Sequence, residues 1–288
     1  MAETPPVVLT IAGFDPSSGA GITADIKTIA AHECYGIACI TALTVQSTQG
    51  VRHVEGVDPK IIAETLQELV SDISVDAVHI GMLGNERVVA AVADFLSGAA
   101  LPHVVLDPIL KSTSGAYLLD SAGTEQLVKR LFPLAQVITP NLAEAAVLTG
   151  LVVTDLDQMR AAAARLHSLG AANVVVTGGD FDKDGKAIDL LSFTTEQGAE
   201  QEVFKAERQR SNSTHGTGCA FASALACHLA YGRGLPEAVL LSKVYISAAI
   251  ASAYPLGHGV GPLHHLYRRS QQRRQAAVSE AEHLSSRT

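Results

Sequence analysis

Short runs of apolar, mostly β-branched residues alternate along the chain with longer segments in which apolar positions recur at helical spacing. The short runs are apolar on both faces, which is typical of strands that helices cover on both sides. They predict strands at residues 7–12, 37–42, 77–80, 104–106, 137–139 and 174–177. The longer segments predict helices at residues 22–33, 61–72, 87–96, 121–131, 142–148 and 156–168. This alternation favours right-handed crossovers and a mostly parallel sheet.

The pattern changes after residue 179. Residues 187–193 and 202–205 are predicted to be antiparallel strands at an edge of the sheet, the first approached through a polar turn at 182–185. Two long helices are predicted next, near residues 217–231 and 236–254. Because no flexible linker or fixed repeat divides the sequence, we expect one domain over residues 1–267 and a polar tail over 268–288. The expected fold class is a three-layer α/β/α domain with a doubly wound, mostly parallel sheet and no separate lid domain.

Composition narrows the possible functions. With 47% hydrophobic and 17% charged residues among 288, the chain is too apolar for disorder and long enough to bury a large core. Its formal net charge of −8 repels phosphate backbones and anionic bilayers, so neither nucleic acid nor a membrane is expected as a partner. Polar residues interrupt every long uncharged stretch, so no membrane-spanning helix is expected. An anionic substrate would need a local site made of backbone N–H groups, a helix N-terminus or a metal ion.

The cysteines and the first residues bear on the compartment. The four cysteines form no CxxC pair, and a chain of this size does not depend on disulfides, which favours free thiols in a reducing compartment. Residues 1–6 carry no basic region of the kind that begins a secretory signal. We therefore expect a cytoplasmic protein.

A glycine-rich segment at residues 13–24 follows a predicted strand and opens a predicted helix. Gly19, Gly21 and Ala24 satisfy G-x-G-x-x-A, the pattern of dinucleotide-binding folds. That interpretation fails because the turn is too long and no acidic residue occurs from 34 to 54 to bind a ribose, so a nicotinamide dehydrogenase is the least favoured function. The segment is then either a loop whose backbone N–H groups approach a ligand or a glycine-rich turn without one.

A second glycine-containing segment runs from residue 213 into an apolar helix. Gly216, Thr217 and Gly218 stand at the helix start, where backbone N–H groups and the helix dipole favour an anion. A thiol at this place is expected to have its pKa lowered from about 8.5 toward neutrality. Cys219 would then be able to remove a proton from a substrate hydroxyl. The alternative for Cys219 is a small buried packing residue, which is the role expected for Cys227.

Acidic and amide side chains stand at the ends of two predicted strands. Asp107 follows the strand at 104–106, while Asn141 and Glu144 follow the next strand. Ligands of open α/β sheets bind beyond the carboxyl ends of the strands, so these three residues are expected to converge there and to suit Mg²⁺. Asn141 and Glu144 also fit a helix-capping box, which does not exclude the first interpretation. The sequence contains neither a P-loop motif nor an HExxH zinc motif.

Short motifs occur in a fixed order along nearly the whole chain. They are Thr10-Ile11-Ala12-Gly13 with Asp15-Pro16-Ser17, Gly19-Ala20-Gly21-Ile22 with Ala24-Asp25, Ile40-Thr41-Ala42-Leu43 with Gln46, Thr48, Gln49 and Gly50, Ile80-Gly81-Met82-Leu83, Leu106-Asp107-Pro108, Ile138-Thr139-Pro140-Asn141 with Glu144, Thr214-His215-Gly216-Thr217-Gly218-Cys219, and Gly257-His258-Gly259 with Gly261-Pro262. Together they resemble the ribokinase-like superfamily and, within it, the bacterial hydroxymethylpyrimidine/phosphomethylpyrimidine kinases of thiamine biosynthesis. The resemblance spans roughly residues 7–266.

The resemblance implies an ATP-dependent kinase that phosphorylates 4-amino-5-hydroxymethyl-2-methylpyrimidine and then its monophosphate, as a homodimer that uses Mg²⁺. It implies that residues 216–219 form the anion hole, that Cys219 acts as the base, and that Gln46 reads the pyrimidine edge through its amide. It assigns the substrate pocket to Gly13, Asp15, Ala20, Gln46, Met82 and Ile109. It assigns ATP binding to Asp107, Asn141, Glu144 and Thr177, the first three of which would also hold Mg²⁺.

Some positions depart from the family pattern. They are Phe14 in place of a small residue, Ser18 in place of a common glycine, Thr177-Gly178-Gly179-Asp180 in place of Lys-Gly-Gly-His, and Lys111 two positions from the usual lysine. The alternatives are a pyridoxal or pyridoxine kinase of the same superfamily and a noncatalytic pyrimidine sensor on a kinase fold. Residues 46–56 and 111–118 are expected to be flaps that cover the site, because phosphoryl transfer requires the exclusion of water.

Overall fold

The computed structural model describes residues 4–112, 114–179, 185–195 and 198–273. Its strands are β1 (Val7–Phe14), β2 (Tyr35–Ser47), β3 (Gly50–Gly56), β4 (Ala77–Ile80), β5 (Val104–Leu106), β6 (Val137–Ile138), β7 (Val174–Gly178), β8 (Lys186–Thr195) and β9 (Gly198–Glu207). Within the described residues they form one 9-stranded sheet in the order β3-β2-β1-β4-β5-β6-β7-β8-β9.

The strands from β2 to β7 in this order run parallel to one another, which confirms the predicted parallel core of the sheet. The prediction of antiparallel strands at one edge is also confirmed, because β8 pairs antiparallel with both β7 and β9. The polar turn predicted at 182–185 lies, apart from Gly185, outside the described residues. The chain leaves β1 toward β2 and later continues on the other side of β1 with β4, so the sheet has its switch point at β1.

The opposite edge was not predicted. Residues 46–56 were expected to be a flap, but β2 extends to Ser47 and pairs antiparallel with β3. The side chains of β3 are half-buried or exposed, so the segment lacks the apolar run that marks the central strands. A two-stranded hairpin at a sheet edge needs little burial, which is why its pattern resembled a loop.

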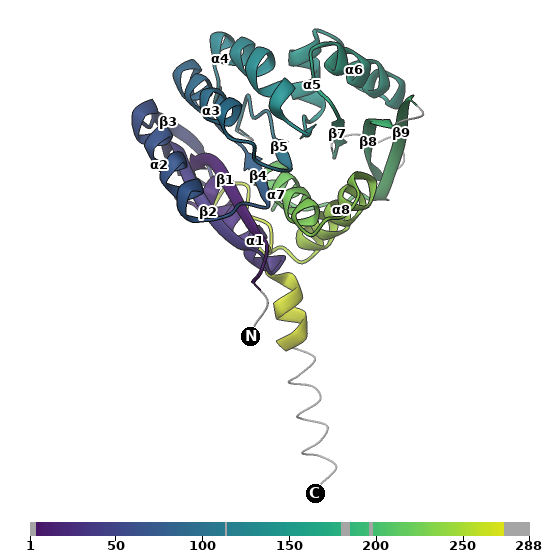
Figure 1. Cartoon of the computed structure of the whole chain (residues 1–288). Helices are drawn as coiled ribbons and strands as arrows, with labels where there is room; N and C mark the ends of the chain where they lie inside the picture. Colours follow the sequence, from purple (N-terminus) through teal and green to yellow (C-terminus); the bar gives the residue numbers. More distant parts are fainter. Residues whose placement is uncertain (1–3, 113, 180–184, 196–197, 274–288) are drawn as a thin grey trace, which may run out of the picture.

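Helices cover both faces of the sheet, as predicted (Figure 1). Their bounds are α1 (Gly21–Ala31), α2 (Pro59–Asp72), α3 (Glu86–Gly98), α4 (Ser121–Gln126), α5 (Leu142–Thr149), α6 (Leu156–Ser168), α7 (Thr217–Ala230) and α8 (Leu235–Ala251). Apolar residues of α2, α3 and α6 form one core with Leu9 and Ile11 of β1, whereas α7 and α8 pack in a second core with Val8. Alternate side chains of one strand thus enter different layers, as a doubly covered sheet requires.

The helix predicted at 121–131 is not continuous. It is α-helical only to Gln126 and then forms a wider π turn over Leu127–Leu131 and a short 3-10 turn over Phe132–Leu134. Pro133 provides no N–H to continue an α-helix, which accounts for the change. At the other end of the chain residues 267–273 are helical, and the rest of the predicted tail, 274–288, lies outside the described residues. None of the helices in the described part of the chain combines the length and apolar character of a membrane span.

Candidate active site

A cavity of about 1180 Å³ lies at the carboxyl ends of the parallel strands. Single-ligand pockets typically measure about 300–1,000 Å³, so this cavity has room for two substrates. Every residue that the sequence assigned to the site lines it: Gly13, Asp15, Ala20, Gln46, Met82, Asp107, Ile109, Asn141, Glu144, Thr177, Gly216, Thr217, Gly218 and Cys219. The predicted anion-binding turn and the predicted ring-reading glutamine therefore share one cavity.

Asp15 follows β1 and organises the glycine-rich loop that leads to α1. Its Oδ1 accepts hydrogen bonds from the backbone N–H and the hydroxyl of Ser17, at 2.8 and 2.7 Å. Its Oδ2 accepts from the N–H groups of Gly19 and Ala20, at 3.2 and 2.9 Å, and from His215 Nε2 at 2.8 Å. Burial acts to raise the pKa of Asp15, but the hydrogen bonds, that from His215 foremost, outweigh it and lower the pKa. Asp15 is therefore a charged anchor of the loop.

The loop before α7 packs directly on this glycine-rich loop. A Cβ on Gly19 would lie 2.2 Å from His215 Cδ2, and a Cβ on Gly216 would lie 2.0 Å from the Gly19 carbonyl oxygen. His215 Nε2 also lies 3.2 Å from Gln46 Nε2. In the sequence His215 was only one residue of a family motif. Nothing in the spacing of residues along the chain indicated that it would contact Asp15 and Gln46.

The backbone conformation of Ser18 shows how a serine can occupy a position where the family commonly has glycine. It has φ 64°, in the left-handed region where glycine carries no steric cost. Its backbone N–H donates to the Asp15 carbonyl oxygen at 3.0 Å, and its carbonyl oxygen accepts from Lys27 Nζ at 2.7 Å. The loop therefore keeps the conformation that a glycine would favour.

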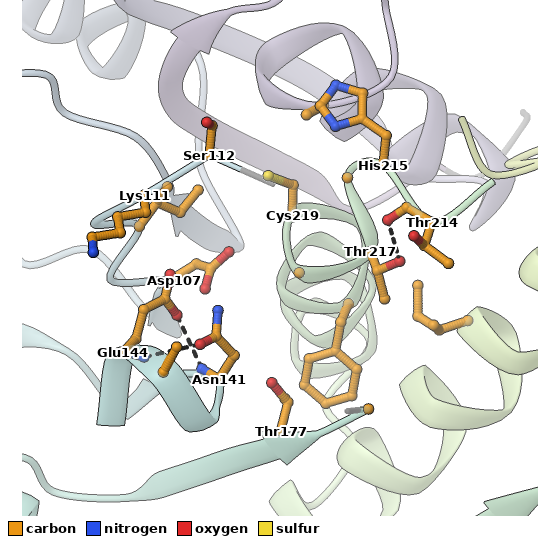
Figure 2. Close-up of a pocket in the computed structure, with 18 of the residues that line it drawn as sticks. Asp107, Lys111, Ser112, Asn141, Glu144, Thr177, Thr214, His215, Thr217 and Cys219 are labelled. Atoms are coloured by element: carbon orange, nitrogen blue, oxygen red, sulfur yellow. Dashed lines mark hydrogen bonds between the residues drawn. The ribbon is translucent and has the colours of Figure 1, made fainter. Parts of the chain in front are cut away.

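The first turn of α7 has the geometry predicted for an anion cradle. Gly216 is its N-cap, with φ 81°, and no side chain caps the helix. The hydroxyl of Thr217 is turned back to the Thr214 carbonyl oxygen at 2.7 Å, as Figure 2 shows. The N–H groups of the turn therefore receive no side-chain cap at the positive end of a 14-residue helix.

Cys219 stands on this turn with its sulfur toward the cavity (Figure 2), but the predicted lowering of its pKa is wrong. Burial raises the pKa of the thiol well above its ordinary value, and the charges of Asp25 and Asp107 raise it further. A backbone hydrogen bond from Gly21 opposes this rise without overcoming it. The helix N-terminus alone was considered from the sequence, whereas the carboxylates around the thiol come from distant segments.

Asp25 belongs to a family motif in the sequence but was given no role in the site. It is fully buried and accepts hydrogen bonds from Thr10 Oγ1 at 2.8 Å and Ser223 Oγ at 2.9 Å. His79 Nδ1 lies 3.4 Å from its Oδ2, and the charge of Asp25 overcomes the effect of burial to raise the pKa of His79. The polar position of Asp25 within an amphipathic helix gave no sign of this partner.

Asp107, Asn141 and Glu144 converge, as the strand ends predicted, on the side of the cavity opposite α7 (Figure 2). Burial raises the pKa of Asp107 to about 6 and, together with the Asp107 charge, raises the pKa of Glu144 to about 8. The capping box is also present: Asn141 Oδ1 accepts from the Glu144 N–H at 2.9 Å, and Glu144 Oε2 accepts from the Asn141 N–H at 3.0 Å. The capping interpretation is therefore confirmed, and Mg²⁺ binding by the same residues stays a prediction.

This donor set fits a divalent cation. A Cβ on Gly218 would lie 3.3 Å from Asp107 Oδ2, so a carboxylate oxygen approaches the turn whose N–H groups favour an anion. Two repelling carboxylates beside a turn whose N–H groups favour an anion form a site that a hard cation with oxygen ligands would neutralise. Asn141 Oδ1 already accepts the capping hydrogen bond, so its contact with a cation would use its second lone pair or a water molecule.

A buried ion pair lines the far end of the cavity, near Thr177. Lys243 Nζ donates to Asp189 Oδ2 at 2.7 Å, and Asp189 Oδ1 accepts from the Gly178 N–H at 3.0 Å. The lysine was not singled out from the sequence, although a single basic residue in the mostly apolar helix α8 was an available signal. Its partner Asp189 is the β8 neighbour of the predicted nucleotide residue Thr177.

Apolar side chains form the opposite end of the cavity. Met82 and Ile109 pack with Ala42 and Leu118, and a Cβ on Gly13 would lie 2.9 Å from Met82 Sδ. The glycine therefore admits the methionine to the wall of the predicted ring pocket. Phe14, a departure from the family pattern, also lines the cavity.

The segment at 111–118 carries the displaced lysine. Lys111 pairs with Tyr117 in an isolated bridge, and its Nζ lies 4.3 Å from the centroid of the Tyr117 ring. A Cβ on Gly50, at the β2–β3 turn, would lie 3.0 Å from Ser114 Cβ, so the two segments expected to be flaps meet there. Their movement over the site stays a prediction.

The three-layer fold, the cavity at its switch point and the helix N-terminus opposite clustered carboxylates define a ribokinase-like phosphotransferase. A family model for phosphomethylpyrimidine kinase matches residues 15–264. The chain belongs to the phosphomethylpyrimidine kinase family.

Curated relatives agree with this assignment. The chain is 42% identical to the hydroxymethylpyrimidine/phosphomethylpyrimidine kinase of Streptomyces coelicolor, over 91% of the chain and 95% of that protein. It is 46% identical to the thiamine biosynthesis bifunctional protein ThiED of Geobacter sulfurreducens, over 90% of the chain. The chain spans only 52% of that longer relative.

Solved structures show the same fold. A phosphomethylpyrimidine kinase from Clostridium difficile has a TM-score of 0.74 and 38% identity, covering 85% of this chain and 99% of that chain. A pyridoxal kinase from Bacillus subtilis, solved as an ADP complex, has a TM-score of 0.83 and 36% identity, covering 92% of this chain and 99% of that chain.

Proposed function

We propose that this kinase transfers the γ-phosphoryl group of ATP to 4-amino-5-hydroxymethyl-2-methylpyrimidine and then to the resulting monophosphate, giving the diphosphate used for thiamine. The curated kinases that the chain resembles support this substrate. One observation carries the proposal: the uncapped turn at 216–219 and the amide of Gln46 line the same cavity.

The pyrimidine ring lies between Gln46 and the apolar wall of Met82 and Ile109. The Gln46 amide offers a donor and an acceptor, which match the 4-amino group and the neighbouring ring nitrogen. The substrate hydroxymethyl group then points toward the first turn of α7. This placement fixes the hydroxyl close to the phosphoryl group, and such alignment supplies most of the rate in phosphoryl transfer.

The N–H groups of residues 216–219 bind the oxygens of the migrating phosphoryl group, whose charge spreads over them in the transition state. Asp107 and Glu144, with Asn141, would hold Mg²⁺ near the phosphates, and the cation would supply charge neutralisation there. Thr177 and the Lys243–Asp189 pair contact the more distant part of the nucleotide. All of these residues line one cavity, which supports the assignment.

Cys219 receives the proton of the substrate hydroxyl. Its raised pKa means that only a minor fraction is thiolate at neutral pH. A loose transition state needs the base only late, so that a minor fraction is sufficient. As the oxygen–phosphorus bond forms, the hydroxyl proton passes to Sγ and the bond from ATP to its γ-phosphorus breaks, releasing ADP.

Product analysis tests the proposal. The protein is incubated with ATP, Mg²⁺ and the pyrimidine alcohol, and the products are separated by ion-exchange chromatography. The monophosphate should form first and the diphosphate should follow, with one ADP released at each step. Absence of both phosphorylated pyrimidines would contradict the proposed substrate.

A second candidate is pyridoxal phosphorylation, which the close fold similarity to the Bacillus subtilis pyridoxal kinase favours. Pyridoxal also presents a ring with a hydroxymethyl group, but it has no amino group next to a ring nitrogen, the pair of groups that Gln46 would bind. The ratio of kcat/KM for the two alcohols decides between them. The pyrimidine should be preferred, and a preference for pyridoxal would reverse the assignment.

We further infer a cytoplasmic homodimer. The described cysteines Cys34, Cys39, Cys219 and Cys227 are all free thiols, which suits a reducing compartment. Four large apolar side chains of β2 are between 37 and 57% exposed, namely Tyr35, Ile40, Leu43 and Val45. A second copy would remove them from water. Sedimentation equilibrium should give twice the chain mass, and replacement of Leu43 by a charged residue should reduce it to the monomer mass.

A further inference from the structure

The hydrogen-bonding groups around Gln46 determine which way its amide faces. The amide end placed as Nε2 lies 3.2 Å from His215 Nε2, and the end placed as Oε1 lies 3.2 Å from Thr44 Oγ1. The two ends of a primary amide have the same shape, so their donor and acceptor neighbours decide which end is which.

Thr44 has one hydroxyl hydrogen, and the backbone already uses it. Its Oγ1 donates to the Phe14 carbonyl oxygen at 2.9 Å, closer than its 3.2 Å contact with Gln46. A carbonyl oxygen can only accept, so the hydrogen must point to Phe14. Toward Gln46 the hydroxyl therefore offers a lone pair, which requires an N–H from the amide.

At the other end of the amide, His215 requires an acceptor, the amide oxygen. Its Nε2 lies 2.8 Å from Asp15 Oδ2, and Asp15 is a carboxylate whose pKa is lowered. A charged carboxylate only accepts, so His215 Nε2 must carry a hydrogen whether the ring is neutral or protonated. A protonated Nε2 has no lone pair left for an N–H of Gln46. It can only share its hydrogen with an amide oxygen.

We propose that the Gln46 amide is held with its oxygen toward His215 and its nitrogen toward Thr44, and that the Asp15–His215 pair thereby sets the specificity for a 4-aminopyrimidine. Both neighbours independently require this orientation. His215 is itself fixed, since its ring packs on Gly19 and its backbone N–H donates to the Gly261 carbonyl oxygen at 3.0 Å. His215 and Asp15 are positioning residues that act through Gln46.

The fixed amide determines where the substrate must present a hydrogen-bond donor and where it must present an acceptor. This consequence rests on the proposed function. The exocyclic amino group donates to the oxygen on the His215 side, and the ring nitrogen accepts from the amide N–H on the Thr44 side. A 4-oxo analogue, with a carbonyl in place of the amino group and a hydrogen on the ring nitrogen, reverses both roles. A fixed amide rejects that analogue, whereas a free amide would turn over and accept it.

The test measures kcat/KM for the amino alcohol and for its 4-oxo analogue with the full chain. The wild type should prefer the amino compound by at least about 100-fold, since two buried hydrogen bonds are mismatched in the analogue. His215→Ala and Thr44→Val each remove one of the two restraints on the amide, so each should reduce the preference, and the variant with both substitutions should reduce it to less than about tenfold. Thr44→Val is nearly isosteric, so it keeps the test valid if His215→Ala does not fold.

Ser17→Ala is the matched control. It removes the 2.7 Å hydrogen bond to the other oxygen of Asp15 and leaves His215 in place. Its preference for the amino compound should equal that of the wild type, even where both rates fall. An unchanged preference in His215→Ala and Thr44→Val, or no preference in the wild type, would overturn the proposal.

A second measurement does not depend on turnover. Nitrogen-15 NMR of the labelled protein reports which ring nitrogen of His215 carries hydrogen, with His215→Ala providing the assignment. Nε2 should be protonated in the absence of substrate, and a bare Nε2 would refute the orientation of the amide. If neither alcohol is phosphorylated but Nε2 is protonated, the proposed function fails while the orientation of Gln46 is supported.

Discussion

Gly216→Ala tests whether the turn at the start of α7 is the phosphate cradle. At φ 81° an added Cβ costs roughly 1–2 kcal/mol of conformational energy. That Cβ would also lie 2.0 Å from the Gly19 carbonyl oxygen, where ordinary contact begins at 3.4 Å. The turn and the glycine-rich loop must therefore move apart by about 1.4 Å, and a misplacement of about 1 Å costs roughly 100-fold in rate.

Gly232→Ala is the matched control for this variant. Gly232 has φ 74°, but a Cβ there would meet nothing within 4 Å, and the residue lies just beyond the other end of α7. Urea unfolding should show a loss of roughly 1–2 kcal/mol in Gly232→Ala and a larger loss in Gly216→Ala, where the clash adds to the conformational cost. Coupled ADP-release assays should show kcat lowered at least about 100-fold only in Gly216→Ala. Equal turnover in the two variants would refute the cradle.

Three further predictions concern other parts of the molecule. Cys219→Ala should lose about 100-fold or more in turnover while nucleotide binding, followed by calorimetric titration, persists; wild-type turnover would remove the cysteine from proton transfer. Asp107→Asn should raise the half-saturating Mg²⁺ concentration about 10–100-fold. Because the substitution removes the repulsion between Asp107 and Glu144, the metal-free variant should be at least as stable in urea as the wild type. An unchanged Mg²⁺ dependence would contradict a role of Asp107 in metal binding. Burial lowers the pKa of His228 to about 3. Between about pH 6.5 and 3, His228 therefore binds a proton in the unfolded chain but stays neutral in the folded chain. Stability should therefore fall as the pH drops from 6.5 toward 3, by up to about 1.4 kcal/mol per pH unit for this group, and His228→Phe should flatten that slope in urea melts at several pH values; an unchanged slope would show that His228 does not contribute.

The central architecture was predictable because its physical cause is local. Runs of buried β-branched residues and amphipathic helical segments follow from side-chain periodicity, so the strands at 77–80 and 104–106 and the helix at 156–168 match the structure in full. The β2–β3 hairpin was missed because an edge strand is half-exposed and lacks that periodicity. The π turn after Gln126 was missed because several helical geometries share one apolar pattern.

The residues of the site were predictable for a different reason. Gly216 and Asp107 stand at ends of elements, and parallel strands bring such ends to one edge of a sheet. Their shared cavity therefore follows from element order. The direction of the pKa of Cys219 did not follow, because burial and the charges of Asp25 and Asp107 depend on segments far from it in the chain.

The sequence by itself determined the fold class, the family and many of the residues around the cavity, since these depend on periodicity and on short ordered motifs. Only the tertiary structure decided the long-range contacts: Asp15 with His215, His215 with Gln46, and Lys243 with Asp189. Hydrogen bonds and charge interactions act over a few ångströms in space. Sequence spacing does not record which distant groups come within that range.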